Sequence, residues 1–382
     1  MRNGVLKGSV VIVGSGDPSL VMERVWLLLR QLRDAGVRDI RGDIVLDHGA
    51  FAPDTRSPAD FDNAPSEPYN VLPDALLMNY RSVTLSFQPD PAAHVAHVVV
   101  EPPLAGFAVD ATVPLSNANC DDWRDALRLA ANDATRWHFA GSYPARCGAR
   151  NWPLAYSDPA SYESRLVAAL WREGGGRLSG KVRDGTLPEG ATTVFSFESP
   201  PLAQIVRDIN KYSNNTMAEQ LFLTLGEKPS PEFPAATTGV TQDQAPAALA
   251  QWLHQRLGGA ADGIVVVNGS GLARETRISA RTLAQLLRSD WNSAAMPELM
   301  ASLPLNGVDG TLRRSASMAG RAHLKTGSMR DVVAIAGYVL ADSGRRYVLV
   351  AVINDPNAGA AHPVLDAAID WVERDPALAK AP

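Results

Sequence analysis

The sequence has no run of the roughly 20 apolar residues that a membrane-crossing helix needs. The longest apolar stretch near its start, Val25 to Leu29, is followed by Arg30 and Arg33. It also has no excess of positive charge, since 36 basic side chains stand against 41 acidic ones. These absences exclude a transmembrane segment and argue against a nucleic acid as partner.

Cysteine is scarce, and the first residues, Met1 to Lys7, contain no apolar secretion signal. Taken alone, the missing signal indicates a cytoplasmic protein. Cys120 and Cys147 lie outside any C-x-x-C motif, which argues against metal or redox chemistry. Their spacing across a loop-rich stretch suits one disulfide in an oxidising compartment, and it suits two buried thiols equally well.

What the sequence does have is the composition of a globular protein. At 382 residues it is long enough for two or three domains. With 46% hydrophobic and 20% charged residues, it can bury large cores and is not expected to be disordered.

The first local pattern is similar to a nucleotide-binding turn. Gly8–Val13 predicts a strand, Gly14–Pro18 a turn, and Ser19 can cap a helix. The apolar residues of that helix recur at helical spacing: Val21, Val25, Leu28, Leu29 and Leu32. However, Ser19 stands where a third glycine belongs and Pro18 lacks a backbone donor, so we reject a dinucleotide site.

From Asp39 to about Phe197, short β-like runs alternate with proline- and glycine-rich turns, which predicts a β-rich module. The runs are Gly42–Leu46, Ser82–Phe87, His94–Val100 and Thr193–Phe197. His94 and His97 would point to opposite faces of one strand, so we do not expect them to share a metal ion.

After Pro200 and Pro201 the pattern becomes helical and then ends in a hairpin and a helix. The helical segments are Leu202 to Ile209, a run with Met217, Leu221 and Leu225, then Pro246–Leu257, Ala280–Leu287 behind Ser279 as cap, and Pro363–Glu373. Two β runs, Val332–Leu340 and Tyr347–Ile353, are joined by a glycine turn. Together these elements predict an α/β sandwich core.

Lys325-Thr326-Gly327-Ser328 stands immediately before the first strand of that hairpin. The Lys325 ammonium and the Thr326 hydroxyl can bind the free carboxylate of an extended peptide. Gly327, with Ser328 after it, lets a peptide backbone approach the strand edge. The motif alone is weak evidence, because such common residues also form surface turns.

Ser213-Asn214-Asn215 lies at a polar junction between the first two helices of this region. The Ser213 hydroxyl can relay a proton to a leaving nitrogen, and the Asn215 amide can hold a substrate backbone. The alternative interpretation is a helix cap, because serine and asparagine are favoured there.

The order and separation of S-x-N and K-T-G match serine acyl-transfer enzymes that use S-x-x-K, S-x-N and K-T-G. The chain resembles the penicillin-binding protein and β-lactamase group. It is most similar to the D-alanyl-D-alanine carboxypeptidase/endopeptidases of the penicillin-binding protein 4 type, peptidase family S13. Four ordered blocks carry the resemblance: Gly14–Pro18, Asn268–Leu272 with Arg274, Leu303–Leu312, and Lys325–Tyr338. Asn268 departs from the aspartate expected there.

The resemblance implies an α/β (α+β) fold: a transpeptidase-like domain with a central antiparallel sheet flanked by helices, plus a β-rich inserted module. It implies that residues 1–18 are a remnant of the catalytic domain, 19–197 the insertion and 198–382 the main catalytic part. It further implies that Cys120 and Cys147 pair in the insertion, that the protein is periplasmic, and that it acts without metal or organic cofactor. The implied partners are peptidoglycan stem peptides and β-lactams.

The nucleophile of such an enzyme is missing. No serine in the chain is followed by lysine three residues later, and Ser179-Gly180-Lys181 has the wrong spacing. Serine and lysine one helical turn apart are needed because the amine takes the hydroxyl proton as the oxygen attacks the amide. We therefore expect a serine-type D-Ala-D-Ala carboxypeptidase that is inactive as given.

The explanation we favour is a start codon placed too far downstream, because one truncation accounts for both the missing signal and the missing first motif. DNA upstream of codon 1 would test it. The alternatives are a noncatalytic peptidoglycan-binding pseudoenzyme and a β-lactamase-like hydrolase. The large insertion argues against the β-lactamase. The sequence leaves the oligomeric state open.

Overall fold

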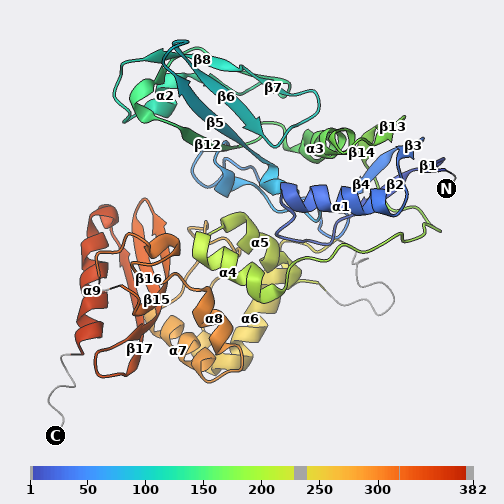
Figure 1. The fold of residues 1–382 in the computed structure, drawn as a ribbon. Helices are drawn as coiled ribbons and strands as arrows, with labels where there is room; N and C mark the ends of the chain where they lie inside the picture. Colours follow the sequence, from blue (N-terminus) through green and yellow to red (C-terminus); the bar gives the residue numbers. More distant parts are fainter. Residues whose placement is uncertain (1–2, 228–238, 318, 376–382) are drawn as a thin grey trace, which may run out of the picture. The chain divides into compact units, whose positions relative to one another are not determined.

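A computed structural model describes residues 3–227, 239–317 and 319–375 of the chain. It has a mixed α/β fold, as the sequence predicts, and it divides into two compact units (Figure 1). Unit 1 consists of Met1–Ser199 and Glu227–Thr241, and unit 2 of Pro200–Gly226 and Gln242–Pro382. Within the described part of the chain, no helix is both long enough and apolar enough to cross a membrane.

Unit 1 begins with two short parallel sheets. One has the order β14-β4-β2 and the other the order β1-β3-β13. The strands are β1 (Val5–Leu6), β2 (Val10–Val13), β3 (Asp39–Ile40), β4 (Ile44–Asp47), β13 (Arg177–Leu178) and β14 (Val182–Asp184). All four residues of β4 are buried, which explains why the first three, Ile44–Leu46, are all apolar instead of alternating with polar residues.

Two helices, α1 (Met22–Asp34) and α3 (Pro159–Glu173), contribute to the same core. As the helical spacing predicts, α1 buries four apolar residues: Val25, Leu28, Leu29 and Leu32. The prediction that Ser19 caps α1 is wrong. The Ser19 backbone N–H donates to Asp17 Oδ1 over 2.8 Å in a local turn, and the helix begins after Val21, which has no capping side chain.

The rest of unit 1 is β-rich. A five-stranded sheet has the order β11-β8-β6-β5-β12, and a small sheet has the order β7-β10-β9. The elements are β5 (Ser82–Asp90), β6 (Val95–Glu101), β7 (Ala108–Val109), β8 (Thr112–Ser116), α2 (Trp123–Leu127), β9 (Leu129–Ala130), β10 (Arg136–Phe139), β11 (Tyr143–Pro144) and β12 (Arg150–Ala155). Cys120 and Cys147 form a disulfide in this region.

The predicted strand Thr193–Phe197 is wrong, because these residues pair with no strand. Phe195 and Phe197 instead pack as partly buried side chains against the core of unit 1, and the Arg24 guanidinium lies 4.8 Å from the Phe197 ring centre. Phe195 and Phe197 are two residues apart because both side chains pack against the core, and this spacing does not reflect backbone pairing in a sheet.

The division of the chain differs from the one implied by the resemblance. Residues 1–18 are not set apart from residues 19–197, because β2 pairs with β4 in register Val10 to Ile44. Glu227–Thr241 also belongs to unit 1, where Val240 forms a β-bridge with Phe51. Unit 1 is thus one body built from the start of the chain and a short later segment.

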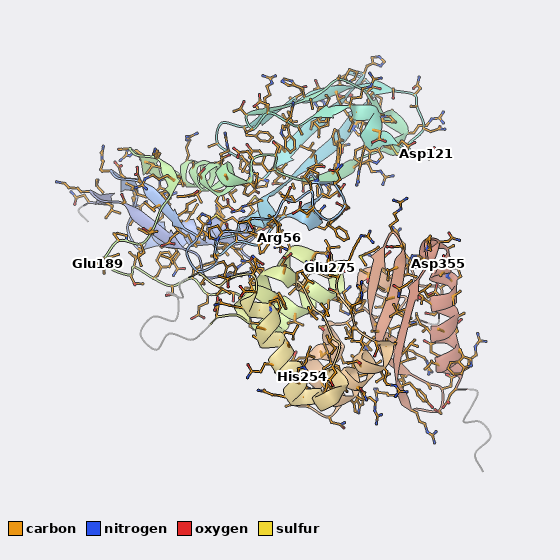
Figure 2. All side chains as sticks on the ribbon, turned by 180° about the vertical axis from the view of Figure 1, so that it is seen from behind. Arg56, Asp121, Glu189, His254, Glu275 and Asp355 are labelled. Carbon is orange, nitrogen blue, oxygen red and sulfur yellow. A yellow bond between two sulfur atoms is a disulfide. The ribbon has the colours of Figure 1, made fainter. Side chains whose placement is uncertain are left out.

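Unit 2 has an antiparallel sheet of order β15-β16-β17, flanked by helices. The strands are β15 (Ala322–Met329), β16 (Val332–Leu340) and β17 (Arg346–Asn354). The helices are α4 (Leu202–Tyr212), α5 (Asn215–Thr224), α6 (Gln244–Leu257), α7 (Ala280–Trp291), α8 (Met296–Ser302) and α9 (His362–Arg374). The predicted hairpin and closing helix are confirmed. Asp355, labelled in Figure 2, directly follows β17.

The two faces of this sheet carry alternate residues of each strand, as the period of two in a strand requires. On β16, Val333, Ile335 and Val339 pack with Leu365 and Ile369 of α9. The intervening Ala336 and Tyr338 pack with Leu287 and Trp291 of α7. The sheet therefore lies between α9 on one side and the α7 and α8 region on the other (Figure 1).

Candidate active site

Ser213 lies in the two-residue break between α4 and α5. It has left-handed backbone angles, φ 53° and ψ 46°, at the end of α4. Asn214 is the N-cap of α5, and its side chain accepts a hydrogen bond from the Met217 N–H over 2.9 Å. The capping role therefore belongs to Asn214, and the side chains of Ser213 and Asn215 are left for other contacts.

A buried ammonium fixes the end of α4. Lys211 Nζ donates to both carboxylate oxygens of Asp309, over 2.8 and 2.7 Å, and to Leu303 O over 2.7 Å. Gly310 has a φ of +57°, and a Cβ there would lie 2.7 Å from Lys211 O. Glycine thus allows the turn after Asp309 to lie against the residues that lead to Ser213.

The K-T-G motif lies within β15, an edge strand of the sheet. The motif precedes β16, the first strand of the predicted hairpin, as expected, but it also forms a strand of its own that the sequence pattern did not predict. Lys325 pairs with Ala336 and Gly327 with Ala334 in an antiparallel ladder with β16. The sequence Lys-Thr-Gly-Ser is polar and does not alternate between apolar and polar residues, so it gives no strand signal. An edge strand can have such a sequence because it is less buried than a central strand.

The structure brings Lys325 and Ser213 together. Lys325 Nζ donates to Ser213 Oγ over 2.8 Å across a sequence separation of 112 residues, and to Thr326 O over 2.7 Å. Burial lowers the pKa of the Lys325 ammonium to about 8, because removal from water disfavours the charged form. Near neutral pH the amine can therefore both hold and release a proton.

The other predicted residues surround this pair in different ways. Asn215 Nδ2 donates to Ser270 O over 2.8 Å, which fixes the amide and leaves Oδ1 as an acceptor. The Thr326 hydroxyl lies 2.7 Å from the Thr311 hydroxyl. Gly327 and Ser328 are exposed along β15.

The turn at Asn268 tolerates its departure from aspartate. Asn268 Oδ1 accepts hydrogen bonds from Ser270 Oγ over 3.0 Å and from the Gly271 N–H over 3.2 Å. A carboxylate oxygen would accept the same two bonds. The substitution therefore keeps the turn that presents Ser270 O to Asn215.

Sequence reasoning did not select Lys211, Asp309, Thr311 or Ser270 as site residues. Asp309, Thr311 and Ser270 stood inside blocks that carried the family resemblance, and that was the available signal. Lys211 is two residues before Ser213, in a helix whose buried side chains are otherwise apolar at Ile205. A lysine on that face signals a buried partner.

The helix-flanked antiparallel sheet and the contact of an S-x-N junction with a K-T-G strand define the penicillin-binding protein class of fold. The chain belongs to the D-Ala-D-Ala carboxypeptidase 3 (S13) family, whose model matches residues 1–375. It is a peptidase of the penicillin-binding protein 4 type.

The relatives are distant but cover most of the chain. It is 23% identical over 372 residues to D-alanyl-D-alanine carboxypeptidase DacB of Haemophilus influenzae, covering 94% of this chain and 74% of the relative. It is 26% identical to a D-alanyl-D-alanine carboxypeptidase of an Actinomadura species, covering 92% of this chain and 66% of the relative. The crystal structure of penicillin binding protein 4 (dacB) from Haemophilus influenzae matches with a TM-score of 0.74 at 20% identity, covering 97% and 84% of the two chains.

Proposed function

We propose that this chain carries the substrate-holding and proton-relay parts of a serine-type D-Ala-D-Ala carboxypeptidase/endopeptidase that acts on peptidoglycan stem peptides and binds penicillin. The hydrogen bond between Lys325 and Ser213 is the observation that carries the proposal. This bond joins the Lys325 ammonium on the edge strand β15 to the Ser213 hydroxyl between α4 and α5. A peptide terminus needs both groups close together, the cation for its carboxylate and the hydroxyl for the proton relay.

Each residue has a role that follows from its contacts. The Lys325 ammonium and the Thr326 hydroxyl bind the terminal carboxylate, and the substrate backbone lies along Gly327 and Ser328. Asn215 Oδ1 accepts a hydrogen bond from the substrate amide. Ser213 passes a proton from Lys325 to the leaving nitrogen and stays neutral itself.

The acyl-transfer step needs a nucleophile. The hydroxyl of a serine loses its proton to a base, and its oxygen attacks the carbonyl carbon of the penultimate D-Ala. The C–N bond then breaks, the released amine takes a proton from Lys325 through Ser213, and the proton of the attacking hydroxyl restores the Lys325 ammonium. Water then cleaves the ester. These 382 residues contain no S-x-x-K pair to supply the attacking oxygen, so we infer that this polypeptide binds substrate without turning it over.

The disulfide of unit 1 supports a periplasmic location, because such bonds persist in oxidising compartments. The second candidate function is noncatalytic binding of peptidoglycan, which the missing nucleophile favours. A β-lactamase is the weaker alternative, since unit 1 is a large addition to a compact hydrolase. Turnover of a chromogenic cephalosporin would identify that activity.

Binding of a peptide ending in D-Ala-D-Ala to the 382-residue protein tests the proposal. A charge-assisted hydrogen bond contributes about 1.5 to 3 kcal/mol, so Lys325→Ala should weaken binding by about 10- to 100-fold in calorimetry. Lys7→Ala, an exposed lysine in unit 1, is the matched control. Amidation of the peptide carboxylate should reproduce the Lys325→Ala loss. Equal affinity of the acid and amide peptides would contradict the proposal.

Fluorescent penicillin tests the nucleophile. The 382-residue protein should lose the label on denaturation, because binding without a serine ester is reversible. If the reading frame upstream of codon 1 encodes S-x-x-K, the extended polypeptide should keep the label. A label that survives denaturation on the shorter protein would show that another residue attacks.

A further inference from the structure

The sheet of unit 2 has two edge strands of different character. β15 carries the polar K-T-G motif at one edge, and β17 lies at the other. All nine residues of β17 pair with residues of β16, so the strand has no bulge. Edge strands usually carry lysine, proline or a bulge that prevents pairing with another chain. From Tyr347 to Ile353, β17 has neither lysine nor proline.

The side chains of β17 are apolar on both faces of the sheet. One face holds Val348 and Val350, which pack toward α7, and the other holds Leu349, Ala351 and Ile353, which pack against the core that includes α9. An apolar run of this kind is typical of a strand in the interior of a sheet. The sequence of β17 therefore gives no protection against pairing with a further strand.

Alternate residues of β17 direct their backbone groups away from β16. The Ala341 N–H donates to Arg345 O over 2.8 Å, and the Asp355 N–H donates to Asp331 O over 3.0 Å. These two bonds flank the β16–β17 ladder, so the odd-numbered residues of β17 bond to β16 and the even-numbered residues point their N–H and C=O groups outward. Among the described residues, no strand, loop or side chain bonds to these outward groups.

A second copy of β17 can bond to all of these groups. If two copies pair antiparallel about a two-fold axis at Val350, then Val350 lies opposite itself, Val348 opposite Val352, and Arg346 opposite Asn354. All five residues are even-numbered, so each one donates its outward N–H to the residue opposite and accepts a bond from it. Both copies use the same surface, as a two-fold dimer requires.

The charges at the two ends of β17 are complementary in this register. Arg345 directly precedes the strand, and Asp355, labelled in Figure 2, directly follows it. The register centred on Val350 places Arg345 of each copy opposite Asp355 of the other. Opposite charges across a strand pair stabilise it, and a shift of the register would separate them. This self-complementarity favours a second copy over a strand of an unrelated protein.

We propose that two copies of the protein associate through β17 and form one continuous antiparallel sheet. Each copy contributes three strands, and the two β15 strands lie at the outer edges of the dimer sheet. Lys325 lies on β15, so the contact uses none of the residues of the Ser213–Lys325 site. The dimer and the proposed function can therefore be tested separately.

Analytical ultracentrifugation of the 382-residue protein tests the association. At micromolar concentration it should give twice the mass of one chain. Val350→Pro removes the outward N–H at the two-fold axis and leaves the bonds to β16 in place, so it should raise the dimer dissociation constant by about tenfold or more. Val350→Ala is the matched control, because it keeps the N–H, and it should remain a dimer.

Cysteine substitutions test the register. Opposite residues of a hydrogen-bonded antiparallel pair have Cα atoms about 5.5 Å apart, within the range of a disulfide. Val350→Cys should therefore give a covalent dimer on oxidation. Val352→Cys is the matched control, because its two copies lie four positions apart, about 13 Å, although Val352 is 43% exposed. The native cysteines are bonded to each other and do not interfere.

Exchange of the end charges tests the direction of pairing. Arg345→Glu and Asp355→Lys should each weaken the dimer several-fold, because each places like charges opposite each other, and the double variant should restore it.

A protein that stays monomeric at micromolar concentration would overturn the proposal. Protection of the even-numbered β17 amides from hydrogen exchange in such a monomer would show that another part of the same chain covers the edge. Equal cross-linking of the two cysteine variants would also overturn it, because the copies would then meet in a different register.

Discussion

Lys211 Nζ lies 2.7 Å from Asp309 Oδ2, and this ion pair connects the two motifs of the site. Lys211 is two residues before Ser213. Asp309 is two residues before Thr311, whose hydroxyl contacts the Thr326 hydroxyl on β15. The pair therefore holds the S-x-N junction and the loop that reaches the K-T-G strand in one arrangement.

Asp309→Ala should destabilise unit 2. The Lys211 side chain is 9% exposed, so removal of the carboxylate leaves a nearly buried ammonium with only Leu303 O as partner. We expect a loss of about 1.5 to 3 kcal/mol in the free energy of unfolding, measured with urea. Asp331→Ala is the matched control, because the Arg274–Asp331 pair is half exposed and screened by water, so its loss should cost clearly less. Equal losses would refute a special role for Lys211.

Lys325 should make the stability of the protein rise with pH in an alkaline window. Its pKa is about 8 in the folded protein and about 10.5 when unfolded, so the unfolded state binds more protons between these values. Relative to Lys325→Met, the unaltered protein should gain stability as the pH rises from 8 to 10.5. Urea unfolding of both proteins at several pH values measures the difference. Parallel curves of unfolding free energy against pH for the two proteins would show that the pKa of Lys325 is not lowered and that its ammonium group is solvated.

The same titration should control binding of a peptide carboxylate. The ammonium form attracts the carboxylate, so affinity should hold below pH 8 and fall by up to about tenfold per pH unit above it. Calorimetry in buffers of different ionisation enthalpy should also show proton uptake on binding near pH 8. Affinity that stays constant from pH 7 to 10 would contradict charge-based recognition.

His48 should depend on Asp74 for its charge. Burial alone would lower the pKa of His48, but the hydrogen bond and the negative charge of Asp74 outweigh it and raise that pKa. The stability contributed by the charged imidazole is complete below about pH 6.5 and is lost as the pH rises through the raised value. Asp74→Asn should lower the His48 pKa in an NMR titration. Asp184→Asn should shift it less, because Asp184 is 62% exposed and 3.5 Å away.

The disulfide should stabilise unit 1. Cys120 and Cys147 are 27 residues apart, and closure of a loop of this length contributes about 2 to 4 kcal/mol. Cys120→Ala/Cys147→Ala should lower the unfolding free energy by that amount without altering binding at Lys325. Reductant should destabilise the unaltered protein and leave the double variant unchanged. A reductant effect on the variant would point to a different cause.

Sequence patterns predicted the elements whose side chains alternate or repeat regularly. The β16–β17 hairpin and α9 have long apolar runs with a glycine turn between the strands, and these were found as expected. The sequence pattern does not predict β15, because this strand lies at the edge of the sheet and its exposed residues are polar. The sequence pattern of Thr193–Phe197 predicts a strand because side chains anchored to a core give the same spacing as a paired strand.

The site could be predicted only in part for a similar reason. Ser213 and Lys325 belong to short motifs whose order carries information, so their proximity could be expected. The pairing of Lys211 with Asp309 depends on a contact across 98 residues, and no local pattern encodes it.

The path of the backbone limits how this protein can be dissected. It passes from one unit to the other at three places, after Ser199, after Gly226 and after Thr241. A single proteolytic cut therefore cannot separate the two units cleanly, because a fragment starting at Pro200 would carry Val240 without Phe51, its β-bridge partner in unit 1. Isolation of unit 2 requires replacing Glu227–Thr241 with a short linker between Gly226 and Gln242.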